Sequence, residues 1–219
     1  MKYPRLDLGT MEAVVNRLGG MDGVRKLLRG KLKITELGFP WTNRAGVIYF
    51  SVTSGGTTGS QWVERLKKKE LKVDDEAESV LRSPDFKPTL GIVTEVAVLT
   101  PGLFTDKNRT TNNIIAEATR RGLMSPHQEV ACLILDALTP REIVEMGFWR
   151  IVVMHKPYIH PPEDHLTNDP RLLCVDMDSG FNNFGLTGYV DVDVDTGIWN
   201  PSYGFAFMKS QVGRRTASN

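Results

Sequence analysis

The feature that most constrains the fold is the stretch of residues 171–212, which glycines divide into short strands and loops. This pattern favours a loop-rich α+β fold over a repeating strand–helix–strand unit. Apolar residues recur through the stretch and provide anchors: Leu172, Leu173, Leu186, Trp199, Phe205 and Phe207. Polar and aromatic residues fill the intervals, and such side chains are typical of recognition surfaces because they combine contact area with adaptable hydrogen bonding. The stretch therefore predicts binding rather than catalysis.

Length and composition are those of a globular protein with a substantial core. The 219 residues are 41% hydrophobic and 24% charged, and 27 basic residues against 26 acidic ones give a net charge of +1. This balance provides no overall field that would attract nucleic acid or an anionic membrane. The sequence has no apolar run of about 18 residues that could span a bilayer, and its first residues contain no apolar signal core. Cys132 and Cys174 lie outside any C-x-x-C motif, so we expect buried thiols and a cytoplasmic protein.

Residues 1–38 are expected to form a helical appendage. The pattern predicts two short helices within residues 10–30, separated by Gly19 and Gly20, with Asp22 capping the second helix. Basic residues cluster in and after the second helix: Arg25, Lys26, Arg29, Lys31 and Lys33. A helix pair with a basic face can read DNA, so a nucleic-acid-binding protein is one alternative. We favour a docking appendage whose basic face is solvated.

Residues 39–219 are expected to form one α+β domain with a small mixed or antiparallel sheet. Its helices are predicted at residues 74–82, 108–121 and 126–138, and the last two should pack on the sheet. Strands are predicted at residues 32–37, 47–53, 94–99 and 148–155. Three helix starts carry capping-box motifs: Thr58–Gln61, Ser125–Gln128 and Thr139–Glu142.

An acidic run near the carboxyl end suggests a cation site. Asp191, Asp193 and Asp195 alternate with valines, which places three carboxylates on one face of a strand. Ca²⁺ would suit such a face, but the spacing does not match an EF-hand loop. We therefore favour an acidic binding face over a metal site.

Three histidines suggest a second cluster of metal ligands. His155, His160 and His165 are spread over a Pro-rich loop and lack the spacing that places zinc ligands on one face of a helix. We favour a solvated loop here. A metal-dependent hydrolase that uses the Asp191–Asp195 run or the His155–His165 loop is the enzymatic alternative.

Two local patterns are similar to those of a known fold. Residues 114–121 form a predicted helix that leads into Gly122–Glu129, and Trp199 is followed by Gly204-Phe205-Ala206-Phe207 before a final strand. Both patterns resemble the C-type-lectin-like fold of formylglycine-generating-enzyme relatives and of the variable proteins of diversity-generating retroelements. The whole chain also resembles a multi-copy bacterial family in which the frame around the tryptophan and the Gly-Phe-Ala-Phe-x-x-Ser-Gln ending recur while intervening residues differ.

The resemblance implies a C-type-lectin-like domain over residues 39–219, with a variable surface at residues 172–207. In the retroelement proteins, adenine-directed mutagenesis diversifies positions on a ligand-facing surface; here Trp199, Phe205 and Phe207 would belong to the constant frame. The positions implied as ligand-binding are Asp176, Asp178, Phe181, Asn182, Asn183, Thr187, Tyr189, Asp191, Asp193, Ser202 and Tyr203. The resemblance implies a non-enzymatic display protein with a protein or other macromolecular partner and no cofactor. The catalytic cysteines of formylglycine-generating enzymes have no counterpart pair in this chain.

Overall fold

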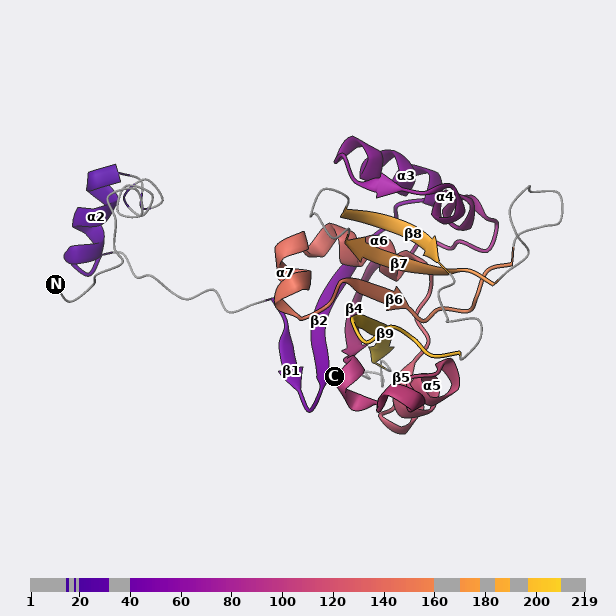
Figure 1. Cartoon of the computed structure of the whole chain (residues 1–219). Helices are drawn as coiled ribbons and strands as arrows, with labels where there is room; N and C mark the ends of the chain where they lie inside the picture. The colour runs from indigo at the N-terminus through magenta and orange to yellow at the C-terminus, as the bar shows by residue number, and fades with distance from the viewer. Residues whose placement is uncertain are drawn as a thin grey trace, which may run out of the picture. The chain divides into compact units, whose positions relative to one another are not determined.

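The computed structural model describes residues 15, 18, 20–31, 40–159, 170–177, 184–189 and 197–209. The chain divides into two compact units, residues 1–38 and residues 39–219 (Figure 1). In the first unit the helix α2 spans Gly20–Leu28, so Asp22 lies in its first turn and does not cap it as expected. Leu28 on this helix is largely exposed to solvent. The strand predicted at residues 32–37 lies outside the described residues.

The second unit is built on a large mixed sheet, so the α+β architecture is as predicted but the sheet is not small. Within the described residues it has nine strands in the order β1-β2-β4-β9-β6-β7-β8-β3, with β5 paired to β9. Neighbouring strands are antiparallel except for β6 with β9 and β3 with β8. The strands are β1 Thr42–Arg44, β2 Val47–Gly55, β3 Lys72–Val73, β4 Leu90–Leu99, β5 Leu123–Met124, β6 Arg150–Val153, β7 Leu172–Met177, β8 Phe184–Tyr189 and β9 Tyr203–Lys209.

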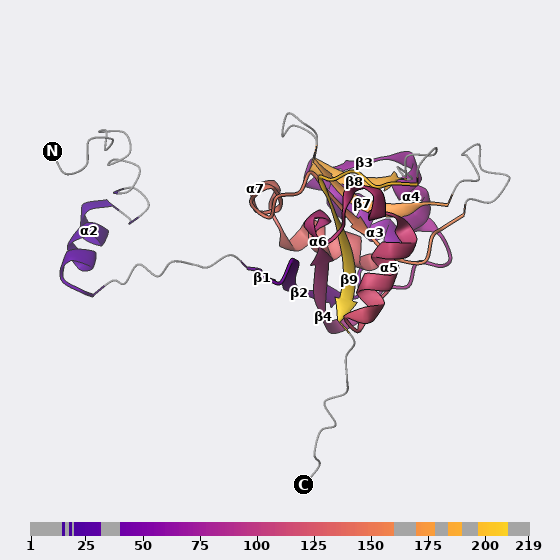
Figure 2. The same ribbon diagram turned by 60° about the horizontal axis from the view of Figure 1, so that its bottom comes forward.

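Strand β9 occupies the centre of this sheet, between β4 and β6, and Figure 2 shows it beside β4. Leu99 of β4 pairs with Phe205, and Val152 of β6 pairs with the same residue on the other side. The segments predicted as strands at 94–99 and 148–155 therefore belong to one sheet. Local sequence patterns do not reveal that β9 lies between β4 and β6, because the three strands are far apart along the chain.

Helices cover both faces of the sheet. The helices are α3 Gly59–Lys68, α4 Asp75–Arg82, α5 Thr111–Arg120, α6 Glu129–Ala137 and α7 Pro140–Glu145, with short 3-10 turns at Pro101–Leu103 and Asp106–Asn108. Buried side chains of α3, α4 and α6 share one core cluster with Ala206 of β9. Buried side chains of α5 share the other cluster with Phe205 and Phe207. Alternate residues of β9 thus enter opposite cores, as expected for a strand covered on both faces.

Two of the three predicted capping boxes are present. Thr58 caps α3 together with Gln61, and Thr139 caps α7 together with Glu142. The prediction at Ser125 is wrong, because the Ser125 hydroxyl donates instead to the backbone carbonyl of Met154, 2.6 Å away. Helix α6 begins later, at Glu129, and its N-cap residue forms no side-chain capping bond. A tertiary contact with the end of β6 has replaced the local cap.

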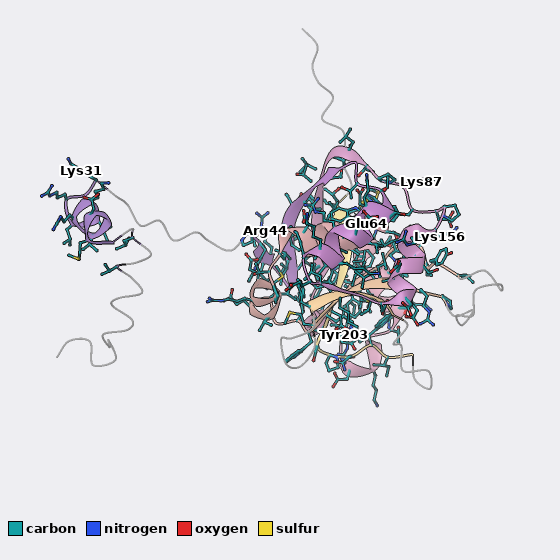
Figure 3. The ribbon with its side chains drawn as sticks, turned by 90° about the horizontal axis from the view of Figure 1, so that it is seen from above. Lys31, Arg44, Glu64, Lys87, Lys156 and Tyr203 are labelled. Atoms are coloured by element: carbon teal, nitrogen blue, oxygen red, sulfur yellow. The ribbon has the colours of Figure 1, made fainter. Side chains whose placement is uncertain are left out.

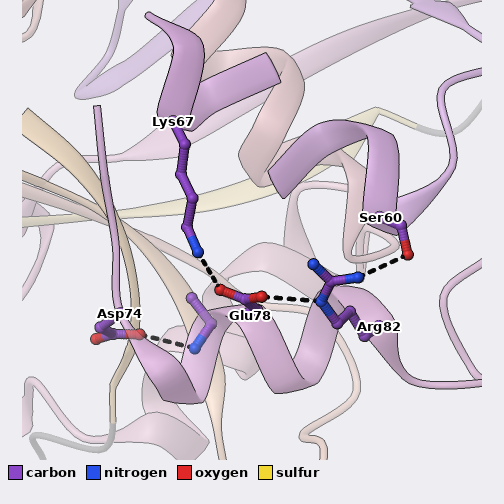
Figure 4. Close-up of polar contacts among 6 residues, drawn as sticks. Ser60, Lys67, Asp74, Glu78 and Arg82 are labelled. Atoms are coloured by element: carbon purple, nitrogen blue, oxygen red, sulfur yellow. Dashed lines mark hydrogen bonds and ion pairs between the residues drawn. The ribbon is translucent and has the colours of Figure 1, made fainter. Parts of the chain in front are cut away.

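Polar contacts hold α3 and α4 together (Figure 4). Glu78 of α4 pairs with Lys67 of α3 and with Arg82, whose guanidinium also donates to Ser60. Asp74 caps α4 by accepting from the backbone N–H of Ala77 at 2.7 Å.

The Asp74 carboxylate also accepts from the N–H of Gly188 in β8, at 3.0 Å. Burial raises the pKa of this carboxyl, although the bonds from Ala77 and Gly188 oppose the shift. Only glycine fits at position 188, because a Cβ there would lie 2.8 Å from the Ala77 nitrogen. One carboxylate thus caps the helix and fixes it on the sheet.

We expect Asp74→Ala to lower the free energy of unfolding by about 2 to 3 kcal/mol. The loss of an aspartate N-cap accounts for about 1 kcal/mol, and the N–H of Gly188 left without its acceptor accounts for about 1 to 2 kcal/mol. Urea titration followed by circular dichroism measures this change. Asp75→Ala is the matched control, because Asp75 is the exposed neighbour in the same turn and its loss should cost about 0.5 kcal/mol. Equal costs for the two variants would contradict the dual role of Asp74.

No helix among the described residues is long and apolar enough to cross a bilayer.

Candidate functional site

Five of the eleven sequence-predicted site residues lie in the described part of the chain, and the structure does not bring all five together on one surface. Strands β7 and β8 are antiparallel, so Met177 lies opposite Phe184 while Leu172 lies opposite Tyr189. Asp176 and Tyr189 therefore lie at opposite ends of this strand pair. The remaining predicted residues of this region lie outside the described residues: Asp178, Phe181, Asn182, Asn183, Asp191 and Asp193.

Two predicted surface residues are buried. Thr187 and Tyr203 expose less than a tenth of their surface, so the expected exposure of both is wrong. Tyr203 begins the central strand β9 and belongs to a core cluster. Thr187 lies within β8, which has a strand on each side. Burial follows from these internal positions in the sheet, which the sequence alone did not show. Ser202, just before β9, is half-buried.

Asp176 has an internal partner that sequence reasoning missed. Arg150 pairs across β6 and β7 with Asp176 and across β6 and β9 with Tyr203. Its guanidinium binds both Asp176 oxygens, at 3.1 and 2.5 Å, and lies 5.0 Å from the centre of the Tyr203 ring. Burial lowers the pKa of Arg150, but the Asp176 hydrogen bond and charge outweigh that effect and raise it overall. Asp176 is therefore already paired with a cation.

The predicted frame residues Trp199, Phe205 and Phe207 are buried. The indole N–H of Trp199 donates to the Thr111 hydroxyl at 3.0 Å, and its ring meets the Phe205 ring edge-on with centroids 5.6 Å apart. The Arg109 guanidinium donates to the Trp199 carbonyl at 2.7 Å. These contacts tie the segment before β9 to the start of α5.

The expectation of a solvated histidine loop is wrong for His155, which is 3% exposed. The backbone N–H of Leu173 donates to its Nε2 at 2.9 Å, and its Nδ1 lies 2.6 Å from the Lys156 carbonyl. Burial lowers the pKa of His155 to about 4, and the Lys156 hydrogen bond opposes that shift. A neutral ring therefore satisfies both partners.

The other proposed metal ligands, His160, His165 and Asp195, lie outside the described residues. Within the described part of the chain, no three His, Cys, Asp or Glu side chains are grouped so that they could hold a metal ion. Both cysteines are buried and neither forms a disulfide, as predicted. Burial raises the pKa of the Cys132 thiol well above its ordinary value, so Cys132 belongs to the core and is not an activated nucleophile.

The candidate site is an open cleft of about 660 Å³. Three segments line it: residues 85–87 after α4, residues 125–128 before α6, and residues 155–159 after β6. These segments are distant in the sequence, and the sheet and α6 bring them together. Such concave sites at the ends of strands and helices are where small ligands usually bind.

His127 lines the α6 side of this cleft, and Glu129, which does not line it, is buried at the start of α6. Glu129 is 1% exposed, and its Oε2 accepts from the N–H of Thr89 at 2.9 Å and from the Thr89 hydroxyl at 2.7 Å. Among the described residues its Oε1 has no hydrogen-bond partner, and the same is true of the buried Nδ1 of His127. The His127 Nδ1 lies 4.0 Å from Glu129 Oε2, which is too far for a hydrogen bond.

The charge state of His127 follows from its surroundings. Burial lowers the pKa of His127, and the charge of Glu129 opposes that shift. The ring is therefore neutral at pH 7, so one of its nitrogens donates a hydrogen bond and the other accepts one. It can contribute hydrogen bonds to a ligand in the cleft, but no charge.

Two lysines supply positive charge to the cleft. Lys87 and Lys156 both line it and project from the same side of the larger unit (Figure 3). Neither ammonium group forms an ion pair with any described residue. Asp85 is the acidic residue among those that line the cleft. No sequence motif marks this site, because the two lysines lie in separate loops.

The chain matches no family model, no curated protein and no solved structure.

Proposed function

We propose that this chain is a ligand-binding protein and that a small anion binds in the 660 Å³ cleft. The observation that carries the proposal is the presence of Lys87 and Lys156 in one concave site without an ion-pair partner among the described residues. Both lysines are exposed, and two cations that line one concave surface attract anions from solution. The neutral His127 ring adds hydrogen-bonding capacity, so the site suits an anion that also forms hydrogen bonds.

Inorganic phosphate and citrate are the first probes of this site. At 100 times its dissociation constant, a ligand that binds only the folded state adds about 2.7 kcal/mol of stability. For a chain of this length, that gain corresponds to a rise in Tm of roughly 5 to 10 °C. We expect at least one of the two anions to raise the Tm of the protein, measured by thermal unfolding at constant ionic strength.

Lys87→Gln should abolish this rise, whereas Lys68→Gln should not. Lys68 is an exposed lysine of α3 that does not line the cleft, so its replacement removes the same charge elsewhere. Failure of both anions to stabilise the protein would contradict the proposal. Stabilisation that persists unchanged in Lys87→Gln would also contradict it, since binding would then lie elsewhere.

A second candidate function, macromolecular recognition, is favoured by the opposite end of β6. There Arg150, Asp176 and Tyr203 are in contact, and Ser202 directly precedes β9. Trp149, beside them in the sequence, is 42% exposed, as are many aromatic residues that anchor interfaces. The resemblance to C-type-lectin-like variable proteins supports display of a binding surface from this end. An Asn-codon-rich near-copy of the coding segment for residues 172–207, beside a reverse-transcriptase gene, would support diversification, and its absence would count against it.

A further inference from the structure

A second, smaller cavity of about 200 Å³ adjoins the cleft. It lies between α5, β5 and the end of β9, and its walls are mostly apolar: Ile115, Ala118, Leu123, Met154, Leu172 and Phe207. Ser125, His155, Lys156 and Pro157 line both the cavity and the cleft. These four residues border both spaces and so form their common boundary.

Most polar side chains at the common boundary are already engaged within the protein. The Ser125 hydroxyl donates to the Met154 carbonyl, and both nitrogens of the neutral His155 ring have backbone partners. Pro157 has no polar side chain. The Lys156 ammonium is the exception, because it forms no ion pair or hydrogen bond with a described residue. Among the described residues of the boundary, Lys156 therefore supplies the one charge available to a ligand, and that charge is positive.

We propose that the ligand of this protein is an amphipathic carboxylate. Its apolar part fills the 200 Å³ cavity against Ile115 and Phe207, and its carboxylate lies in the cleft on Lys156, with Lys87 as the second cation. Apolar walls favour a hydrocarbon or aromatic group over a polar one, since burial of a polar group there would leave it without partners. This inference rests on the proposed function and names the chemical class of the ligand for the same site.

Three probes of related structure separate the two halves of the site. Decanoate carries both the apolar tail and the anion, decanol carries the tail alone, and acetate carries the anion alone. Isothermal titration calorimetry on the full chain measures the Kd of each. We expect decanoate to bind at least about tenfold more tightly than either decanol or acetate, which corresponds to about 1.4 kcal/mol.

Two variants assign each half of the ligand to its place. Lys156→Met should raise the Kd of decanoate about tenfold and leave the Kd of decanol unchanged, because it removes only the cation. Ile115→Asp should raise the Kd of both decanoate and decanol about tenfold, because it puts a charge on the cavity wall. Ile115 is partly exposed, so this substitution does not place a charge in the core.

Each variant has a control outside both spaces. Lys107→Met removes an equivalent positive charge, and Asn112→Asp adds an equivalent negative charge on α5. Both should leave the Kd of decanoate within about twofold. If Lys156→Met leaves decanoate binding unchanged, or if Ile115→Asp does, the inference is wrong.

The outcomes also separate this inference from the proposed function. Stabilisation by phosphate or citrate that depends on Lys87, with decanoate bound no better than acetate, would support the anion site and overturn the amphipathic ligand. An absence of binding by all five probes would overturn both. Decanoate binding that depends on both Lys156 and Ile115 would support the amphipathic ligand, and stabilisation by phosphate or citrate would support the anion site independently.

Discussion

Replacement of Trp199 by alanine is expected to lower the free energy of unfolding by about 3 to 5 kcal/mol, the usual cost of removing a fully buried aromatic side chain. Trp199 is 2% exposed and packs edge-on against Phe205. Its indole N–H also donates a hydrogen bond to the Thr111 hydroxyl at the start of α5. The substitution therefore creates a cavity, removes an aromatic contact and leaves a hydroxyl without its donor. Equilibrium unfolding in urea, followed by far-ultraviolet circular dichroism, measures the loss.

Two further variants show how much of this loss of stability comes from the indole hydrogen bond and how much from burial of the ring. Trp199→Phe keeps most of the ring but removes the indole N–H, so about 1 to 2 kcal/mol should be lost. Trp149→Ala removes a tryptophan that is 42% exposed, and it should cost less than half as much as Trp199→Ala. Similar losses for Trp199→Ala and Trp149→Ala would show that Trp199 is not the structural anchor of this segment.

The second large effect is a loss of stability on acidification that depends on His155. Its pKa in the folded protein is about 4, whereas an exposed histidine has a pKa of 6.5. Between these values the unfolded state binds a proton that the folded state does not, so stability falls as the pH falls. The contribution of His155 is complete above pH 6.5 and is lost progressively toward pH 4. The difference between the two pKa values corresponds to about 3 kcal/mol.

A variant that lacks His155 isolates this contribution. His155→Gln should be less stable than the parent at pH 7 by about 1 to 3 kcal/mol, because the bonds to Leu173 and Lys156 are disturbed. The same variant should lose less stability between pH 6.5 and pH 4. Other titrating groups act equally in both proteins, so the difference between the two pH profiles reports His155. Parallel profiles would show that His155 does not stay neutral in the folded state.

Short-range patterns predicted the parts of the fold that depend on neighbouring residues. The Thr58 and Thr139 caps are confirmed because each needs only the next three residues. The burial of Cys132 and Trp199 is confirmed because apolar periodicity and size favour the core in almost any packing. The Ser125 cap failed because a carbonyl from residue 154, distant in the sequence, competed for the same hydroxyl.

The candidate site depends on strand register, which the sequence did not show. His155 is buried because β7 places the Leu173 N–H beside it, and Asp176 is paired because β6 places Arg150 opposite it. Lys87 and Lys156 share a cleft only after α6 and the sheet have assembled. The sequence predicted a strand at residues 148–155 and loops around Lys87 and Lys156, but the contacts between these segments followed from the order of the strands.

The central position of β9 has a consequence for synthesis of the chain on the ribosome. Strand β9 pairs with both β4 and β6, yet it is the last of the sheet's described strands to be translated. Until it emerges, the nascent protein presents two unpaired strand edges where the finished protein has none, and such edges can pair with other chains. Pairing of β9 with these distant strands also slows folding, because contacts between residues far apart in the sequence form slowly. Translation stopped before Tyr203 should therefore yield an aggregation-prone product that depends on chaperones.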